Sequence, residues 1–372
     1  MLVPVSQTSR RVALQSARLS RARPLIPHSR PALGAAEVRA VARVIRSGQI
    51  AQGPMVERFE AALAGRLGLA HAAAVSSGTA ALHLGLLALG VGPGDEVILP
   101  SLVCAAPLHA VLAAGARPLV VDCDPATANL DPAAARRAVG QRTKAIIVPH
   151  AFGLPADLAE LCALGPPVIE DCAQALGAAY RGRPAGAVGD LCVLSFYATK
   201  MLATGEGGML LSNRRRLVER ARDLRSYDER ADFRPRFNYK MTDVAAALGI
   251  CQLARLDGFL AERRALAAVY DRALAGSPLR LPPRPPDREH GFHRYVVRVE
   301  APGGAAPVLT ALGARGIDAR RPIFRPLHVY LGLPGFPGAA RGWRRMISLP
   351  LYPGLSRARA ARIAMALREY WR

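Results

Sequence analysis

Lysine is rare in this chain, and one of the three lysines stands where an amine could react. Lys144 opens the apolar run Ala-Ile-Ile-Val, which indicates a residue at the edge of a strand, and Lys240 lies in a loop. Lys200 comes just after an apolar strand that ends near Phe196 and just before the glycine-rich segment 205–208. A lysine that forms a Schiff base needs neighbours that lower its pKa and a cleft that admits a ligand. Lys200 fits best, with an ordinary surface lysine as the equal alternative.

Two adjacent carboxylates stand at the end of another apolar strand. The run Val168-Ile169 leads directly into Glu170 and Asp171. Ligand sites in open α/β sheets lie at the carboxyl ends of the strands, and successive residues point to opposite faces, so only one of the two can face a ligand. A carboxylate there could keep the ring nitrogen of a cofactor protonated, which makes the ring an electron sink. Asp171 could instead simply cap a helix.

A short turn after residue 75 offers a site for an anion. The segment Ser76-Ser77-Gly78-Thr79 separates an apolar strand from a long apolar helix, and its glycine allows a tight turn. The free N–H groups at the start of a helix bind phosphate. An ordinary capping turn explains this segment equally well. None of the three features is decisive alone.

Apolar runs alternate with helical patterns over the first two thirds of the chain. The runs are short and continuous, which indicates strands buried on both faces, and strands separated by helices predict a mostly parallel sheet. The fold class is therefore α/β, with helices on both faces of the central sheet. We expect strands at 71–75, 96–100, 117–122, 144–149, 167–170, 190–196 and 208–212, and helices at 37–46, 54–67, 78–89, 107–114, 132–139 and 157–164.

The pattern changes beyond about residue 255, where we expect a smaller α+β domain. Its elements are a helix at 259–273, a proline-rich connector, an alternating strand at 293–299 and a helix at 307–315. We divide the chain into an N-terminal extension at 1–23, a large cofactor-binding domain at 24–255 and a small C-terminal domain at 256–372. The extension is rich in Arg and Ser and resembles a transit peptide in composition, but we expect a disordered extension or a start codon placed too early.

The chain is strongly basic, with a formal charge of +22. Only three of its 50 basic residues are lysine, and the arginines are scattered through every segment. Because nucleic-acid binding requires a clustered basic footprint, we expect no nucleic-acid partner. A positive cleft would still attract a phosphorylated cofactor and a diphosphate substrate.

The six cysteines are dispersed, with no Cys-x-x-Cys pair and no Cys/His cluster. Most lie in apolar runs, which predicts buried free thiols in a reducing compartment, with neither a disulfide nor a metal site. No apolar run is long enough to cross a bilayer. We therefore expect a cytoplasmic protein without a membrane partner.

These features follow one another in the order of a known family. The chain resembles the DegT-type sugar aminotransferases, a branch of the fold-type-I (aspartate-aminotransferase-like) enzymes, which use pyridoxal 5'-phosphate. The resemblance runs from about Ile26 to the C-terminus. It rests on the number of matching segments that occur in the same order as in the family. The matching segments are 47–48, 52–54, 76–84, 92–97, 143–147, 169–177, 195–208, 237–243, 325–328 and 348–351.

The resemblance implies roles for particular residues. Lys200 would hold the cofactor and then carry the proton, and Asp171 would pair with the ring nitrogen. Gln174 would lie near the ring, close to its hydroxyl. The phosphate would be held by Gly78, Thr79 and Ser195.

Asn238 would reach the phosphate of the neighbouring subunit, which implies a homodimer with shared active sites. Two positions depart from the family pattern. Cys104 stands where an aromatic residue commonly covers the ring, so stacking is thinner or comes from another side chain. Tyr197 stands where many members have His, near the reacting face. Substrate contacts are implied at Arg320, Arg321, Arg325 and His328, with little weight because arginine is so common here.

The activity that the resemblance implies is transfer of an amino group from an amino acid, expected to be glutamate, to a keto sugar. We expect the sugar to be nucleotide-linked and to serve sugar, polysaccharide or natural-product biosynthesis. Two alternatives stay open. One is a pyridoxal-phosphate-dependent sugar dehydratase, against which the presence of Lys200 argues. The other is a non-catalytic cofactor-binding regulator, against which the set of Lys200, Asp171 and Ser195 argues.

Overall fold

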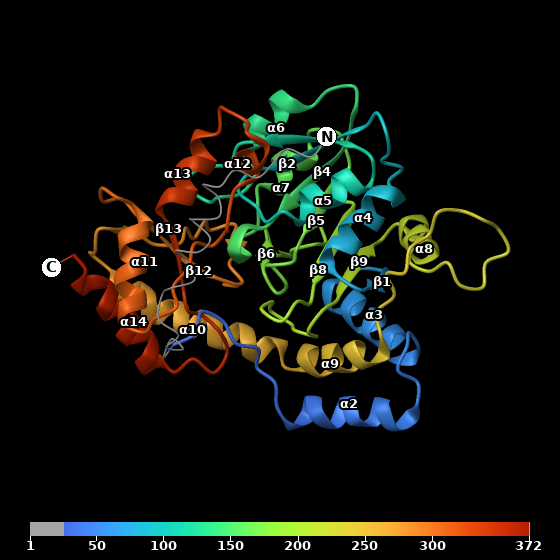
Figure 1. Cartoon of the computed structure of the whole chain (residues 1–372), viewed down its shortest axis with the longest axis horizontal. Helices are drawn as coiled ribbons and strands as arrows, with labels where there is room; N and C mark the ends of the chain where they lie inside the picture. Colours follow the sequence, from blue (N-terminus) through green and yellow to red (C-terminus); the bar gives the residue numbers. More distant parts are fainter. Residues whose placement is uncertain (1–25, 372) are drawn as a thin grey trace, which may run out of the picture.

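The structure is a computed structural model that describes residues 26–371 (Figure 1). The predicted extension at residues 1–23 lies outside the described residues. One sheet of seven strands dominates the first part of the chain, and a smaller sheet of three strands follows later in the sequence. The strands of the large sheet are β1 (His71–Val75), β2 (Glu96–Pro100), β3 (Arg117–Val121), β4 (Thr143–Pro149), β5 (Val168–Asp171), β8 (Leu191–Ser195) and β9 (Gly208–Ser212).

The large sheet is mostly parallel, as expected. Its order is β1-β9-β8-β5-β4-β2-β3, and the run from β8 to β3 is parallel throughout. Only β9 is antiparallel to its two neighbours, so β1 again points the same way as β8. The carboxyl ends of β1, β2, β5 and β8 therefore lie at one edge of the sheet, which is where open α/β sheets bind ligands.

Both faces of the large sheet are buried under helices, which explains why its strands are apolar without alternation. Neighbouring residues of a strand enter different cores: Ile147 packs in the core with α4 and α5, whereas Ile146 packs in the core with α6 and α7. The covering helices are α3 (Pro54–Leu67), α4 (Gly78–Ala88), α5 (Ala106–Ala113), α6 (Pro132–Ala138), α7 (Leu158–Cys162), α8 (Arg215–Leu224) and α9 (Asp243–Ala254), with α2 (Ala35–Ser47) packed outside α9.

The C-terminal part has its own core around an antiparallel sheet, in the order β10-β12-β13. Helix α10 (Leu256–Leu274) leads from α9 to this core, and the pair bends by 58° where the domain boundary at residue 255 is predicted (Figure 1). The elements of this part are β10 (Leu279–Arg280), β12 (Tyr295–Val299), β13 (Met346–Leu349), α11 (Ala305–Ala314), α12 (Leu327–Leu331), α13 (Pro337–Arg345) and α14 (Arg357–Glu369). A third sheet joins β6 (Ala179–Tyr180), β7 (Arg183–Pro184) and β11 (Arg288–Glu289).

The α/β fold class is confirmed, and the expected strands and helices differ from the observed ones by a few residues at most. The sequence patterns did not predict the pairing of β12 with β13 or the helices α8, α9, α12, α13 and α14. They also predicted that most cysteines are buried, but Cys104 and Cys162 are exposed because both lie in turns or at a helix end. Within residues 26–371 no single helix is long and apolar enough to cross a membrane; α9 and α10 pass that test only as a bent pair.

Candidate active site

Lys200 lies in a tight hairpin that connects β8 to β9. The hairpin is closed at its base by a hydrogen bond from the Phe196 N–H to the Gly207 carbonyl (2.9 Å), and the Lys200 N–H donates to the Tyr197 carbonyl (2.8 Å). Gly207 has a φ of 152°, and a Cβ there would lie 2.6 Å from the Met241 side chain. The hairpin is thus fixed by its backbone, and it holds Lys200 at the carboxyl edge of the sheet. Tyr197 is about half exposed on the same hairpin.

The buried position of Lys200 favours a neutral amine. Burial lowers the pKa of the Lys200 ammonium group, and Arg294 lowers it further, against the opposing effects of Cys104 and Asp171. A lowered pKa makes the amine available as a nucleophile and as a base. Cys104 is open to solvent on one side, yet its enclosure by protein raises the pKa of the thiol, as does Asp171. Lys200, Cys104 and Asp171 are therefore close enough for the charge of each to act on the others.

The two carboxylates at the end of β5 differ in how many hydrogen bonds they accept. Glu170 is fully buried, and both of its oxygens are occupied: it accepts from His150 Nε2 (3.0 Å) and from the backbone N–H groups of Gly186 (2.8 Å), Val188 (2.8 Å) and Gly189 (2.6 Å).

Asp171 faces the other way and keeps a free oxygen. Its Oδ1 accepts from the Ala173 N–H (3.0 Å), and among residues 26–371 no cation lies within 4 Å of the carboxylate. Burial raises the pKa of Asp171, while the Ala173 N–H and Lys200 oppose the shift. The prediction that only one carboxylate faces the ligand fits this arrangement, and Asp171 is the one with capacity for a partner.

The turn after β1 meets the end of β8. Ser77 caps α4, since its Oγ accepts the Ala80 N–H (3.1 Å). The N–H groups of Gly78 and Thr79 lie in the first helical turn and have no acceptor within the helix. Gly78 packs so closely on Ser195 that a Cβ would lie 2.8 Å from the Ser195 Cβ. The Ser195 hydroxyl therefore lies beside free N–H groups, an arrangement that suits a phosphate.

Gln174 lies in the turn after Asp171, and its side chain is hydrogen-bonded to a segment with a strained backbone. Its Oε1 accepts from the Phe152 N–H (3.2 Å). Phe152 has a left-handed backbone (φ 59°), which is uncommon for a bulky residue and persists only where its surroundings fix it. The Phe152 carbonyl in turn accepts from the Arg294 N–H (3.1 Å).

A cavity of about 800 Å³ opens beside the hairpin, lined by Thr199 and by residues of the C-terminal part. Its size suits a ligand larger than an amino acid. Arg320 lines it and makes a two-point ion pair with Asp318 (2.7 Å for each bond). Arg321 also lines it; its guanidinium lies 4.8 Å from the centre of the Trp343 ring and donates to the Trp343 carbonyl.

Two other predicted residues lie apart from this cavity. The Ser101 hydroxyl accepts from the His328 N–H (3.2 Å) and donates to His328 Nδ1 (2.6 Å), and the imidazole stacks on Phe336. His328 thus fixes the loop that follows β2, and its direct contact with a substrate stays a prediction. Asn238 is exposed, next to Tyr239, whose carbonyl accepts the Ser76 N–H (2.8 Å).

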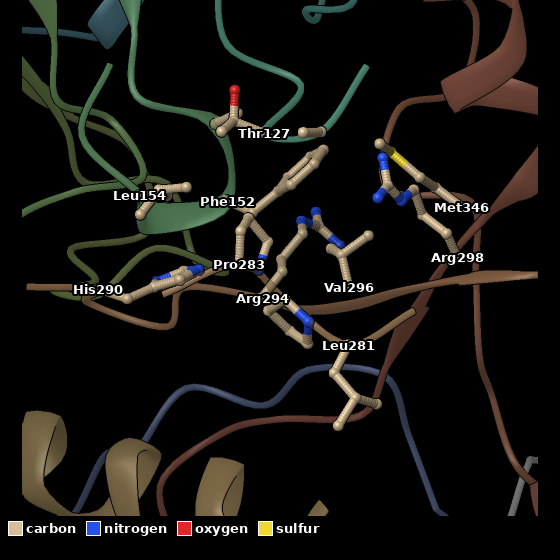
Figure 2. A pocket seen from close by; sticks show the side chains of 13 residues that line it. Thr127, Phe152, Leu154, Leu281, Pro283, His290, Arg294, Val296, Arg298 and Met346 are labelled. Carbon is tan, nitrogen blue, oxygen red and sulfur yellow. The ribbon is translucent and has the colours of Figure 1, made fainter. Parts of the chain in front are cut away.

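The sequence analysis missed His293 and Arg294, which come before β12. Arg294 contributes to the lowered pKa of Lys200, and burial, followed by Arg294 and Lys200, lowers the pKa of His293 well below its usual value. Arg294 lines the large cavity and also a small one of about 20 Å³, where its side chain reaches between Phe152 and Val296 (Figure 2). The only signal in the sequence is a pair of ionisable residues at the start of an apolar strand.

The residues at the sheet edge fit pyridoxal phosphate. Asp171, a buried residue, has a second carboxylate oxygen that accepts no hydrogen bond within residues 26–371 and could accept one from a ring N–H, and the close approach of Gly78 to Ser195 leaves room and donors for a phosphate. Lys200 offers an amine with a lowered pKa to the aldehyde. These three groups come from the ends of β5, β1 and β8 and would suit the ring nitrogen, the phosphate and the aldehyde of the cofactor.

Comparison with known proteins identifies the family. Residues 31–368 match the model of the DegT/DnrJ/EryC1/StrS aminotransferase family. The aminotransferase TlmJ from Streptoalloteichus hindustanus is 37% identical, with a TM-score of 0.88 over 93% of this chain and 98% of that chain. The sugar aminotransferase CalS13 from Micromonospora echinospora is 32% identical, with a TM-score of 0.85 over 93% of this chain and 100% of that chain.

The cofactor appears in a third similar structure. The PLP form of Spr1654 from Streptococcus pneumoniae, described as a sugar aminotransferase, is 28% identical, with a TM-score of 0.88 over 92% of this chain and 98% of that chain. A PMP form of the same protein matches equally well. The chain therefore belongs to the DegT/DnrJ/EryC1/StrS aminotransferase family and is a pyridoxal-phosphate-dependent sugar aminotransferase.

Proposed function

We propose that this enzyme transfers the amino group of glutamate to a keto sugar that is linked to a nucleotide. The observation that carries the proposal is the arginine-lined cavity of about 800 Å³ beside the Lys200 hairpin. A cleft lined with positive charge attracts both a dicarboxylic donor and a diphosphate acceptor. The cavity is also large enough for a sugar with an attached group.

Within this proposal the protein's residues have separate tasks. When bound, pyridoxal phosphate supplies an aldehyde and an electron-accepting ring. Lys200 Nζ takes the proton from the donor's α-carbon in the first half of the reaction and delivers a proton to the acceptor carbon of the sugar in the second half. Asp171 holds the proton on the ring nitrogen. The phosphate rests on the N–H groups of Gly78 and Thr79 and on the Ser195 hydroxyl.

Gln174 is proposed to orient the ring through its hydroxyl, because Phe152 already fixes the position of its amide. Cys104 is proposed to border the ring where a larger side chain would cover it. Asn238 is proposed to reach the phosphate of a second subunit in a homodimer. Its exposure supports this, as do the exposed apolar side chains of α2, Val38 and Ile45, which are 70% and 59% accessible.

The experiment that tests the proposal is a panel of keto sugars, with and without a nucleotide, offered with glutamate to the cofactor-loaded enzyme. We expect an amino sugar, detected by mass spectrometry, from nucleotide-linked substrates and a much weaker signal from the free sugars. A dehydrated product without nitrogen would favour the dehydratase alternative. A panel in which only free cyclitol or sugar ketones are aminated would contradict the nucleotide-linked acceptor.

A further inference from the structure

Arg294 is a cation enclosed by protein without an anionic partner. Its Nη1 donates to His28 Nε2 (3.2 Å), and its Nε is buried without a hydrogen-bond partner. Within residues 26–371 the charged groups that act on it are Arg320 and Cys104, and no carboxylate is among them. Buried arginines are ordinarily paired, so an unpaired one that lines a cavity has capacity for an anionic ligand.

The other arginines of the same cavity are already engaged. Arg320 is neutralised by Asp318 through two bonds of 2.7 Å. Arg321 stacks on Trp343, and Arg325 lies over Tyr330 at 5.5 Å from the ring centre. Among residues 26–371, Arg294 is therefore an arginine of this cavity that neither a carboxylate nor an aromatic ring engages.

The surroundings of Arg294 orient it without removing its charge. Burial lowers the pKa of Arg294 to about 10, with a further contribution from Arg320, so it remains protonated at neutral pH. Burial, followed by Arg294 itself, lowers the pKa of His28 to about 3. His28 is therefore neutral and can accept the hydrogen bond from Arg294, while the Ser348 hydroxyl lies 2.9 Å from the same ring nitrogen.

Arg294 also faces the same cavity as the loop that carries the reacting amine. It lines the large cavity together with Thr199, the residue before Lys200, and its charge acts on both Lys200 and Cys104. An amino-acid donor carries a carboxylate on the carbon that bears the reacting amine. In a nucleotide-linked sugar the diphosphate is separated from the ketone by the sugar ring, so a cation this close to the lysine suits the donor better.

We propose that Arg294 binds a carboxylate of the amino donor and so presents the donor's amine at Lys200. The inference rests on the proposed function for the identity of the donor. Arg294 would bind the donor in the first half of the reaction and release its carboxylate with the keto acid before the sugar enters.

The test measures binding of a carboxylate that cannot react. Glutarate, which has two carboxylates and no amine, is titrated into the cofactor-loaded enzyme by calorimetry for the wild type, Arg294→Gln and Arg294→Lys. We expect at least a tenfold weaker affinity in Arg294→Gln and partial recovery in Arg294→Lys. Arg298→Gln is the matched control, because Arg298 lies on the same side of the chain in β12 and donates to the Pro125 carbonyl instead; its affinity should equal that of the wild type.

A kinetic readout accompanies the binding. In single turnovers with glutamate, Arg294→Gln should raise the glutamate concentration for the half-maximal rate at least tenfold, while uridine diphosphate binding stays unchanged. Unchanged glutarate affinity in a folded Arg294→Gln enzyme would overturn the inference, as would a loss confined to uridine diphosphate. If Arg294→Gln does not fold, the uncharged Arg294→Met takes its place: wild-type affinity in that variant decides against the inference, and a loss decides for it. A wild type that binds glutarate through Arg294 but aminates no keto sugar would remove the proposed function and leave the carboxylate site standing.

Discussion

The carboxyl edge of the large sheet and the arginine-lined wall of the cavity lie side by side but are built differently. At the edge, positions are set by backbone contacts: Gly78 touches Ser195, and Glu170 is held by three N–H groups. On the wall, positions depend on contacts between side chains: Arg320 is mostly exposed and pairs with Asp318, and Arg321 lies over the Trp343 ring. The sheet edge holds the groups that react with every substrate, whereas the residues of the cavity wall can differ when the substrate differs. Substitutions at the edge should therefore have larger effects than those on the wall.

The largest effect is expected for Lys200→Ala, because no other group at the edge can form the covalent link to the cofactor or move the proton. We expect no measurable turnover and no absorbance from protein-linked cofactor. Lys144→Ala is the control, since Lys144 is exposed at the start of β4, and it should behave as the wild type. Full activity in Lys200→Ala would contradict the assignment of this residue.

Asp171→Ala should come next. Removing the carboxylate takes away the charge that keeps the ring nitrogen protonated, and single electrostatic groups of this kind lower barriers by about 3 to 4 kcal/mol. We expect kcat to fall about 10²- to 10³-fold while the protein stays folded. The measurement is single-turnover kinetics with glutamate, beside a thermal unfolding curve. Rates within a factor of three of the wild type would show that another group keeps the ring nitrogen protonated.

The difference between the two regions also explains what the sequence could predict. The apolar runs and helical periods gave the strands, the helices and the edge at which they end, because local patterns determine those elements. The positions of Lys200 and Asp171 at that edge follow from these elements, since Asp171 is the last residue of β5 and Lys200 stands five residues beyond the end of β8, whereas their roles came from the family resemblance. Their mutual approach required only the rule that parallel strands end at one edge.

The wall could not be predicted in the same way. Arg294 resembles every other arginine of an arginine-rich chain, and its position depends on a bond to Phe152, which lies 142 residues earlier. His328 was predicted to touch the substrate, but a partner 227 residues away, Ser101, engages its ring. Such contacts are tertiary and leave no local pattern. A charged residue in an apolar segment, as at Arg294, was the one available hint.

Glu170→Gln tests whether the edge depends on the buried carboxylate. An amide NH₂ would face one of the backbone donors and leave it unsatisfied, which destabilises the fold by about 2 to 3 kcal/mol. Denaturant titration would measure the change in the free energy of unfolding. Asp157→Asn is a suitable control, because Asp157 is partly exposed in its ion pair with Arg288. A loss below that of the control would contradict a structural role for Glu170.

The pKa of Glu170 also predicts how the stability of the fold depends on pH. Burial alone would raise the pKa of Glu170, but hydrogen bonds from His150, Gly189 and Gly186 outweigh it and lower the pKa. A carboxyl with a lowered pKa in the folded state stabilises the protein above its unfolded value of about 4.3, and the contribution disappears as the pH falls toward the folded value. The wild type should thus lose more stability than Glu170→Gln does as the pH falls from about 4.3 toward the lower, folded-state pKa.

A smaller effect is expected for Gly78→Ala. The added Cβ would lie 2.8 Å from the Ser195 Cβ, so the start of α4 must move away from β8 by a few tenths of an ångström. We expect about tenfold weaker cofactor binding, or about 1.4 kcal/mol, measured by titration of the cofactor-free protein. Gly65→Ala, in α3, has no atom within 4 Å of the added Cβ and should leave cofactor affinity unchanged.

The smallest effect is expected on the wall, for Arg320→Gln. Its guanidinium is 63% exposed, and pairs of this kind contribute at most about 1 kcal/mol because water and salt screen them and both side chains lose freedom. Unfolding in denaturant should therefore shift by less than that amount, and the affinity for the cofactor should not change. A loss as large as that of Glu170→Gln would mean that the wall is as tightly fixed as the edge. The wall would then be part of the same rigid unit, and a change of substrate within this architecture would require the sheet edge to change with it.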